Sequence, residues 1–118
     1  MFWKKQTPYS VSSLLKKSKR TDVVIALDDD SLSQAAAYLK GKRGRGRKLY
    51  GVGCSSTNAY YLDKGVISAM VTCDYFTLGY ESIEATLEGE DIKKIKIDPR
   101  LIRSGEVYVE KNEKLLFP

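Results

Sequence analysis

Three consecutive carboxylates, Asp28-Asp29-Asp30, directly follow the short apolar run Val23 to Leu27, and an Ala-rich segment at helical spacing comes next. This pattern predicts a buried strand, a tight acidic corner and a helix. Carboxylates at such a corner can accept hydrogen bonds from the paired hydroxyls of a sugar or polyol. They can also bind Mg²⁺ or cap the helix that follows. The residues alone leave these three roles open.

A second polar corner is expected at the run Cys54-Ser55-Ser56-Thr57-Asn58, which follows another apolar segment. Backbone amides and hydroxyls at a helix start can bind an anion or a hydroxylated ligand. The same residues can simply cap the helix. Cys54 has no histidine to activate it, because the sequence contains none, so we predict a buried and unreactive thiol.

A third corner, Cys73-Asp74-Tyr75-Phe76, repeats the order of strand, acid and helix. Tyr75 or Phe76 could stack on the apolar face of a sugar, or Asp74 could cap a helix with Phe76 in the core. Cys54 and Cys73 end successive predicted strands, so a disulfide is open, although spacing alone does not supply its geometry.

The absence of histidine excludes His-ligated metal sites and His-based acid-base catalysis. No other catalytic set is present, so we predict a binding protein rather than an enzyme, with no metal and no cofactor. The 118 residues fit one small domain, and the net charge of +5 is only mildly basic.

Five of the seven residues from Lys42 to Lys48 are Lys or Arg, and such a loop could neutralise phosphates. It lacks interleaved aromatic residues and would lie at the opposite end of the sheet from the acids. We therefore expect a solvated loop, and nucleic acid remains only an alternative partner. The sequence has no apolar window long enough for a membrane span and no signal peptide.

Strands alternating with helices of about ten residues predict an α/β fold, a three-layer α/β/α sandwich with a small, mostly parallel sheet. The run Val23 to Leu27 is apolar throughout, which predicts that both of its faces are covered. We expect a single domain over residues 1–118, with an irregular lead-in (1–9), βα units (10–89) and tail strands (90–118). The expected strands are 23–27, 49–53 and 66–73, and the expected helices are 10–17, 32–40, 59–64 and 76–87.

In the tail, Ile92, Ile95 and Ile97 on one side of Asp98-Pro99, and Val107 to Val109 on the other, predict two short strands. Inward-facing residues are expected on two of the helices. They are Leu32, Ala35, Ala36 and Leu39 on the first, and Leu78, Ile83 and Leu87 on the second.

Four segments, residues 22–39, 49–54, 61–89 and 112–118, resemble the C-terminal lobe of type I periplasmic sugar-binding proteins of ABC transporters. The likeness covers residues 10–118. It implies a flavodoxin-like partial lobe, a small-molecule ligand that is a sugar, membrane transporter subunits as partners, and an extracytoplasmic location for the parent protein. A chain complete as it stands, without a signal peptide, would instead be cytoplasmic.

The resemblance assigns the ligand contacts to the ends of the three strands. In that family the lobe contributes such residues to a cleft between two lobes, and half a cleft should bind only weakly. It implies that Asp28 contacts the ligand and that Asp30 or Ser31 caps the helix. The expected cleft residues are Asp28, Asp29, Cys54, Ser55, Cys73, Asp74 and Phe76.

The family's first lobe, and the first strands of its second lobe, have no counterpart in this sequence. One of those strands would pair with Val23 to Leu27, so we expect an exposed apolar edge there. We predict a homodimer through that edge, swapped elements, or a tail that folds back over it.

The same lobe also serves as the sensing domain of lactose-repressor-like transcription regulators, which is the first alternative. The second is nucleic-acid binding through Lys42 to Lys48. A phosphoacceptor receiver domain is disfavoured because Gly53 and Cys73 end the next two strands, where that fold needs other residues.

Overall fold

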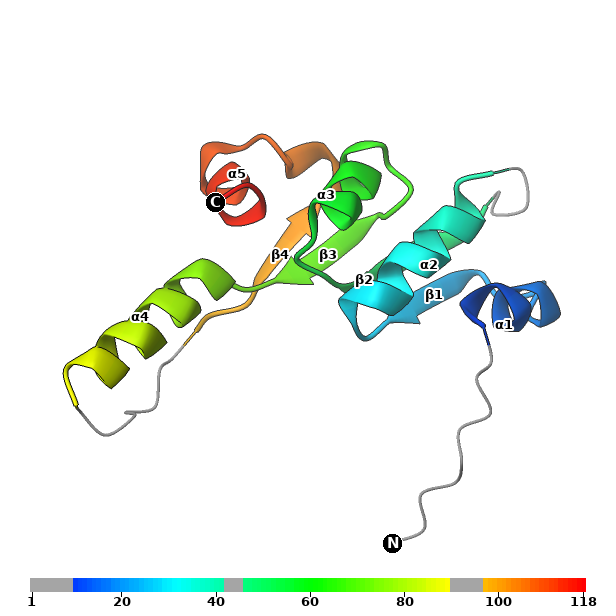
Figure 1. Cartoon of the computed structure of the whole chain (residues 1–118). Helices are drawn as coiled ribbons and strands as arrows, with labels where there is room; N and C mark the ends of the chain where they lie inside the picture. The colour runs from blue at the N-terminus through cyan, green and yellow to red at the C-terminus, as the bar shows by residue number, and fades with distance from the viewer. Residues whose placement is uncertain (1–9, 42–45, 90–96) are drawn as a thin grey trace, which may run out of the picture.

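A four-stranded sheet organises the chain in the computed structural model, which describes residues 10–41, 46–89 and 97–118. Figure 1 shows the strands in the order β1-β2-β3-β4. The first three run parallel and β4 lies antiparallel to β3. Their bounds are β1 (Val23–Ala26), β2 (Lys48–Val52), β3 (Ala69–Thr72) and β4 (Arg100–Arg103). The α/β class and the mostly parallel sheet are therefore confirmed.

Helices connect and flank these strands. They are α1 (Val11–Lys17), α2 (Asp29–Leu39), α3 (Ser56–Asp63), α4 (Tyr75–Leu87), the 3-10 turn η2 (Ser104–Glu106) and α5 (Glu110–Leu116). The expected strand before Cys73 starts later than predicted, at Ala69, because the preceding residues turn out of α3. Helix α3 starts earlier than predicted because its cap is Ser55.

Helix α2 packs closely on the sheet. Its predicted inner stripe of Leu32, Ala35, Ala36 and Leu39 is buried, which confirms the expectation from spacing. Gly51 of β2 permits the approach: a Cβ there would lie 2.7 Å from the Ala26 carbonyl and 2.7 Å from a Leu32 methyl.

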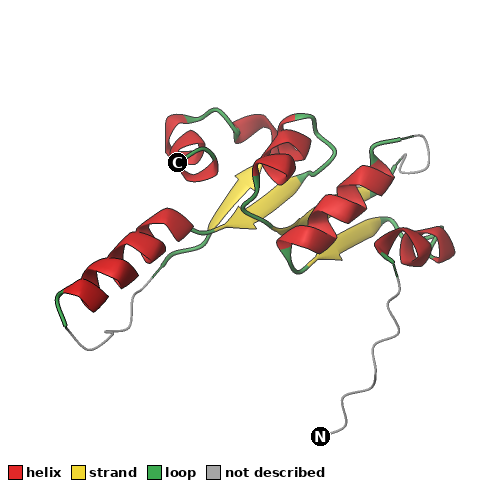
Figure 2. Ribbon diagram, viewed as in Figure 1, coloured by secondary structure: helices red, strands yellow, loops and turns green. Residues whose placement is uncertain are grey.

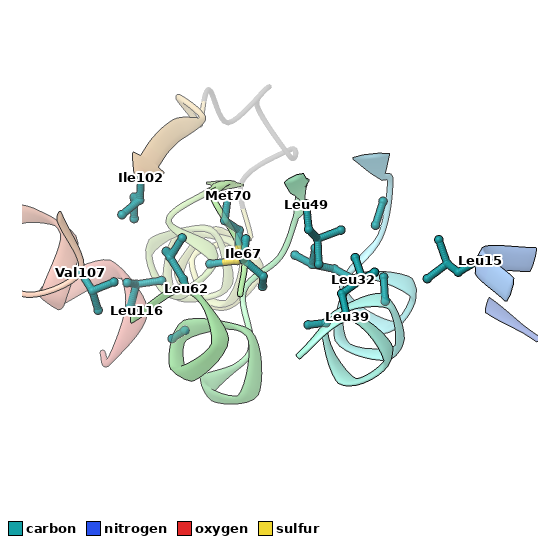
Figure 3. Packing of buried hydrophobic residues seen from close by; sticks show 14 residues of the cluster. Leu15, Leu32, Leu39, Leu49, Leu62, Ile67, Met70, Ile102, Val107 and Leu116 are labelled. Carbon is teal, nitrogen blue, oxygen red and sulfur yellow. The ribbon is translucent and has the colours of Figure 1, made fainter. Parts of the chain in front are cut away.

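The core runs continuously from α1 to α5 beneath one face of the sheet. Figure 3 shows side chains from α1, α2, α3, β2, β3, β4 and the C-terminal segment meeting there. Among them are Leu15, Leu32, Leu49, Leu62, Met70, Ile102, Val107 and Leu116.

The opposite face of the sheet is largely uncovered. Val23 is 47% exposed, Ile25 66% and Leu101 50%. The prediction that both faces of the first strand are covered is therefore wrong. Of the three expected layers, the described residues form the sheet and one helical layer, consistent with a shortest dimension of 17 Å.

Helix α4 projects away from the sheet (Figure 2) and has no buried residue. Two of its expected inward residues are exposed, Ile83 at 64% and Leu87 at 82%. Phe76 is 67% exposed, so the alternative that placed it in the core is also wrong. The apolar stripe of α4 is present, but no described element buries a residue of it.

The tail differs from its prediction. The predicted strand at Val107 to Val109 is a turn. The strand of this region is instead β4, which begins at Arg100, directly after the predicted Asp98-Pro99 turn. Val107 is buried without pairing, at 1% exposure. Ile92 and Ile95 lie outside the described residues, and Ile97 is not in a strand.

A buried asparagine organises this C-terminal segment. The Asn112 side chain donates to the Glu106 carbonyl at 2.8 Å and accepts from Arg100 at 3.4 Å. These contacts join α5 to η2 and β4, which accounts for a helix where the sequence showed only an apolar end.

Candidate ligand-binding site

The carboxyl ends of β1, β2 and β3 lie at one edge of the sheet, and α2, α3 and α4 begin there (Figure 1). In open α/β folds this edge is where ligands bind. The sequence-predicted residues follow these three strands directly, so the parallel topology brings them to the same edge.

Asp29 joins the first two corners. Its Oδ1 accepts hydrogen bonds from the backbone N–H of Cys54 at 2.7 Å and of Ser55 at 3.0 Å. The Asn58 side-chain amide donates to the same oxygen at 2.8 Å. Burial raises the pKa of Asp29, but these three hydrogen bonds outweigh it and leave the pKa below the ordinary 3.8.

Asn58 completes this network from the first turn of α3. It is fully buried, and its amide also donates to the Asp29 carbonyl at 2.9 Å. Its Oδ1 accepts from the Ser33 hydroxyl at 3.1 Å. The sequence predicts only a capping role for Asn58. The sequence signal for its role is spacing. Asn58 lies next to Ala59 and one helical turn before Leu62, so its polar side chain falls on the buried side of a short helix.

Asp28 is the N-cap of α2. Its carboxylate accepts from the Ser31 backbone N–H at 2.8 Å and from the Ser31 hydroxyl at 2.9 Å. These bonds hold the pKa of Asp28 below its ordinary value. The expectation that Asp30 or Ser31 caps the helix is therefore wrong, because Asp30 instead accepts from Gln34 at 2.8 Å.

Capping does not bury Asp28. The side chain remains exposed, and a carboxylate has further lone pairs for a ligand hydroxyl.

Ser55 caps α3, and its hydroxyl accepts from the Asn58 N–H at 3.2 Å. Cys54 beside it is exposed, which overturns the prediction of a buried thiol. Partial desolvation of its sulfur and the nearby Asp29 charge raise the pKa of Cys54. The thiol is thus accessible but mostly protonated at neutral pH.

The third corner has its own cap. Asp74 accepts from the Thr77 hydroxyl at 2.7 Å and the Thr77 N–H at 3.0 Å, and both bonds lower its pKa. Asp74 and Thr77 also line a groove with residues 97–101 and α5. Tyr75 and Phe76 are exposed, and Cys73 is half-buried.

The edge therefore presents exposed carboxylate, thiol, hydroxyl and aromatic groups on a base held together by Asp29. Such groups can recognise a hydroxylated ligand by hydrogen bonds and by contact with an aromatic ring. In the described parts of the chain, no three His, Cys, Asp or Glu side chains gather as metal ligands do. None of the helices described here has the length and apolar character required to cross a membrane.

A periplasmic binding protein domain matches residues 1–89 of the sequence. The chain belongs to the periplasmic binding protein family. Among curated proteins, none matches it closely enough to count as a relative. The family is one of binding proteins rather than enzymes.

Solved structures share its fold. A carbohydrate transporter solute-binding protein from Agrobacterium radiobacter, in complex with D-arabinose, superposes with a TM-score of 0.76 at 19% identity. That match covers 90% of this chain and 38% of the other. An ABC transporter solute-binding protein from Agrobacterium vitis, bound to α-D-tagatopyranose, gives 0.76 at 17% identity, covering 92% and 39%.

A glucose-galactose binding protein from Geobacillus stearothermophilus gives a TM-score of 0.69 at 18% identity, covering 84% of this chain and 37% of that one. The chain thus spans less than two-fifths of the length of these structures. None of these comparisons favours the regulator or the nucleic-acid alternative.

Proposed function

We propose that this chain is part of a solute-binding protein of an ABC transporter and that its ligand is a sugar. The observation that carries the proposal is the family match over residues 1–89, which includes all three polar corners. The proposed contacts are Asp28, Asp29, Cys54, Ser55, Cys73, Asp74 and Phe76. The proposed setting is extracytoplasmic, with membrane transporter subunits as partners.

The chemistry of the edge supports a hydroxylated ligand. Asp28 offers an exposed carboxylate, and the Asp29 network holds the neighbouring corner in place. Phe76 offers an exposed ring at the third corner, which follows β3 at the same edge of the sheet. Because the ligand would contact only one lobe, the chain should bind with a dissociation constant of about 1 mM or weaker.

A titration followed by amide NMR tests this proposal. D-Arabinose, D-tagatose, D-glucose and D-galactose are added separately to the ¹⁵N-labelled chain. We expect one or more of them to shift the amide signals of residues 28–31, 54–56 and 73–76 in a saturable way. Shifts that are absent for all four sugars, or that are spread over the whole surface without saturation, would reject the proposal.

A matched pair of variants separates ligand contact from capping. Asn is as good an N-cap as Asp, so Asp28→Asn keeps α2 capped while it removes the charge. We expect Asp28→Asn to weaken sugar binding several-fold. Asp30→Asn removes the same charge from the same turn and should bind as the wild type does.

We also propose that two copies of the chain associate through β1, by pairing of its edge or by exchange of elements. Within the described residues β1 pairs only with β2, so its other edge is free. Val23, Ile25 and Leu27 beside that edge are 47%, 66% and 80% exposed. A free strand edge flanked by apolar side chains favours pairing with another chain.

A further inference from the structure

The two cysteines lie just beyond the carboxyl ends of neighbouring parallel strands, since β2 ends at Val52 and β3 at Thr72. In the β2–β3 register Gly51 faces Met70 and Val52 faces Val71. The ladder continues beyond Val52, because the Gly53 N–H donates to the Val71 carbonyl at 3.0 Å. Counted two positions past the last printed pair, Val52 and Val71, the same register brings Cys54 opposite Cys73.

This placement suits a covalent bond between the sulfurs. Adjacent strands lie about 4.8 Å apart, and disulfides join residues whose Cα atoms are about 4.4–6.8 Å apart. Facing residues of a parallel ladder also direct their side chains to the same side of the sheet. Cys54 is exposed and Cys73 half-buried, so a small reagent can reach the pair.

The phenol of Tyr75 lies within the electrostatic range of both thiols. Burial raises the pKa of its phenol, and the neighbouring Cys73 and Cys54 raise it further. Both sulfurs therefore act electrostatically on the same phenol.

We propose that Cys54 and Cys73 form a reversible intramolecular disulfide by exchange with a small disulfide such as glutathione disulfide. One cysteine thiolate attacks glutathione disulfide and releases one glutathione thiolate, which takes up a proton. The second cysteine thiolate then attacks the protein sulfur of the mixed disulfide and releases the other glutathione. The protein loses two hydrogens and one glutathione disulfide becomes two glutathione thiols.

The bond would tie two of the three corners together. Cys54 lies in the connection that Asp29 holds to α2, and Cys73 precedes the Asp74 cap of α4. Oxidation would thus fix the base of α4 to the end of β2, and reduction would release it. Because closing the loop between the cysteines restricts the unfolded chain, oxidation should also raise the urea midpoint of unfolding.

The test is exchange of the full chain with glutathione buffers of increasing oxidised fraction in mildly alkaline solution. Remaining thiols are trapped with iodoacetamide and the products are mapped by mass spectrometry without reduction. We expect a monomeric product that lacks two hydrogens and yields a peptide linking Cys54 to Cys73. Cys54→Ser and Cys73→Ser, checked for folding by circular dichroism, should each stop at a mixed disulfide with glutathione.

Two results would overturn the proposal. The first is a wild-type chain that carries glutathione or iodoacetamide on both cysteines under conditions that modify each single variant. The second is a cross-link formed only between chains. Disulfide formation requires no sugar, so its failure would leave the sugar-binding proposal untouched, and the reverse also holds.

Discussion

A single carboxylate oxygen, Oδ1 of Asp29, accepts two hydrogen bonds from the connection between β2 and α3 and a third from Asn58 in the first turn of α3. Bonds to an ionised acceptor are stronger than those between neutral groups. Two of the donors are backbone amides, so removal of the carboxylate leaves both of them without this acceptor. This residue supports the site whether or not it touches ligand.

Asp29→Ala should therefore lower the free energy of unfolding by about 2–3 kcal/mol, because it leaves three donors without their acceptor. Urea denaturation measures this change. Asp30→Ala, on the same turn, is the matched control and should stay within about 0.5 kcal/mol of the wild type. Equal effects of the two substitutions would show that the Asp29 contacts do not stabilise the fold.

The same residue predicts a dependence on pH. The pKa of Asp29 is lowered below 3.8 in the folded chain, so the unfolded chain binds its proton first as the pH falls. Its charge therefore stabilises the fold fully at pH values above the unfolded-state pKa of 3.8. This contribution is lost as the pH falls through the lower pKa of the folded chain. The stability difference between wild type and Asp29→Asn should shrink between about pH 5 and pH 2. A difference that stayed constant over this range would contradict the assignment.

At the scale of elements, two isoleucines have opposite surroundings. Ile102 of β4 is fully buried, whereas Ile83 of α4 is 64% exposed. Helix α4 has no buried residue, so its stability depends on its own hydrogen bonds and its Asp74 cap.

Ile102→Ala should cost about 2–4 kcal/mol, and Ile83→Ala less than about 0.5 kcal/mol. Chemical denaturation of the two variants makes the comparison. Hydrogen exchange supplies a second measurement, since amides of α4 should exchange much faster than those of α2. A large cost at Ile83 would mean that α4 packs against a surface in solution.

Much of this arrangement could be predicted from the sequence. The stripe of α2 was predictable because Leu32, Ala35, Ala36 and Leu39 recur at helical spacing, and the parallel strands followed from their apolar runs. The environment of α4 was not predictable, because an apolar stripe shows which face prefers burial and not whether another surface is present. For the same reason the run Val23 to Leu27 suggested two covered faces where one is bare.

The candidate site was predictable in position rather than in detail. Strand ends located the three corners, but the residue that caps α2 depends on exact backbone geometry, which favours Asp28 over Asp30. The buried Asn58 was overlooked because its partners lie on another connection. Helix α5 was missed because Asn112 acts through contacts with η2 and β4 that local spacing does not reveal.

At the scale of the whole molecule, the described residues leave the outer edge of β1 unpaired and one face of the sheet largely uncovered. Net charge is +5, so two copies repel each other weakly at long range, whereas the apolar area around β1 favours association. The proposed homodimer is therefore a property of this surface as a whole.

Ile25→Lys places a charge at the middle of β1, where Ile25 is 66% exposed, so it should disturb folding little and association strongly. We expect light scattering to give a dimer for the wild type and a monomer for Ile25→Lys. Leu14→Lys, at a 56% exposed apolar position on α1, is the control and should remain dimeric. A monomeric wild type would reject association through β1.

The contacts of Asp29 also affect the thermodynamics of any ligand at the carboxyl edge. They order the corner after β1 and the corner after β2 before a ligand arrives, so little conformational entropy remains to be lost there on binding. The corner after β3 has no comparable link among the hydrogen bonds described here. Ordering that corner should therefore account for most of the conformational entropy lost on complex formation. A ligand that does not contact this corner should lose less conformational entropy on binding.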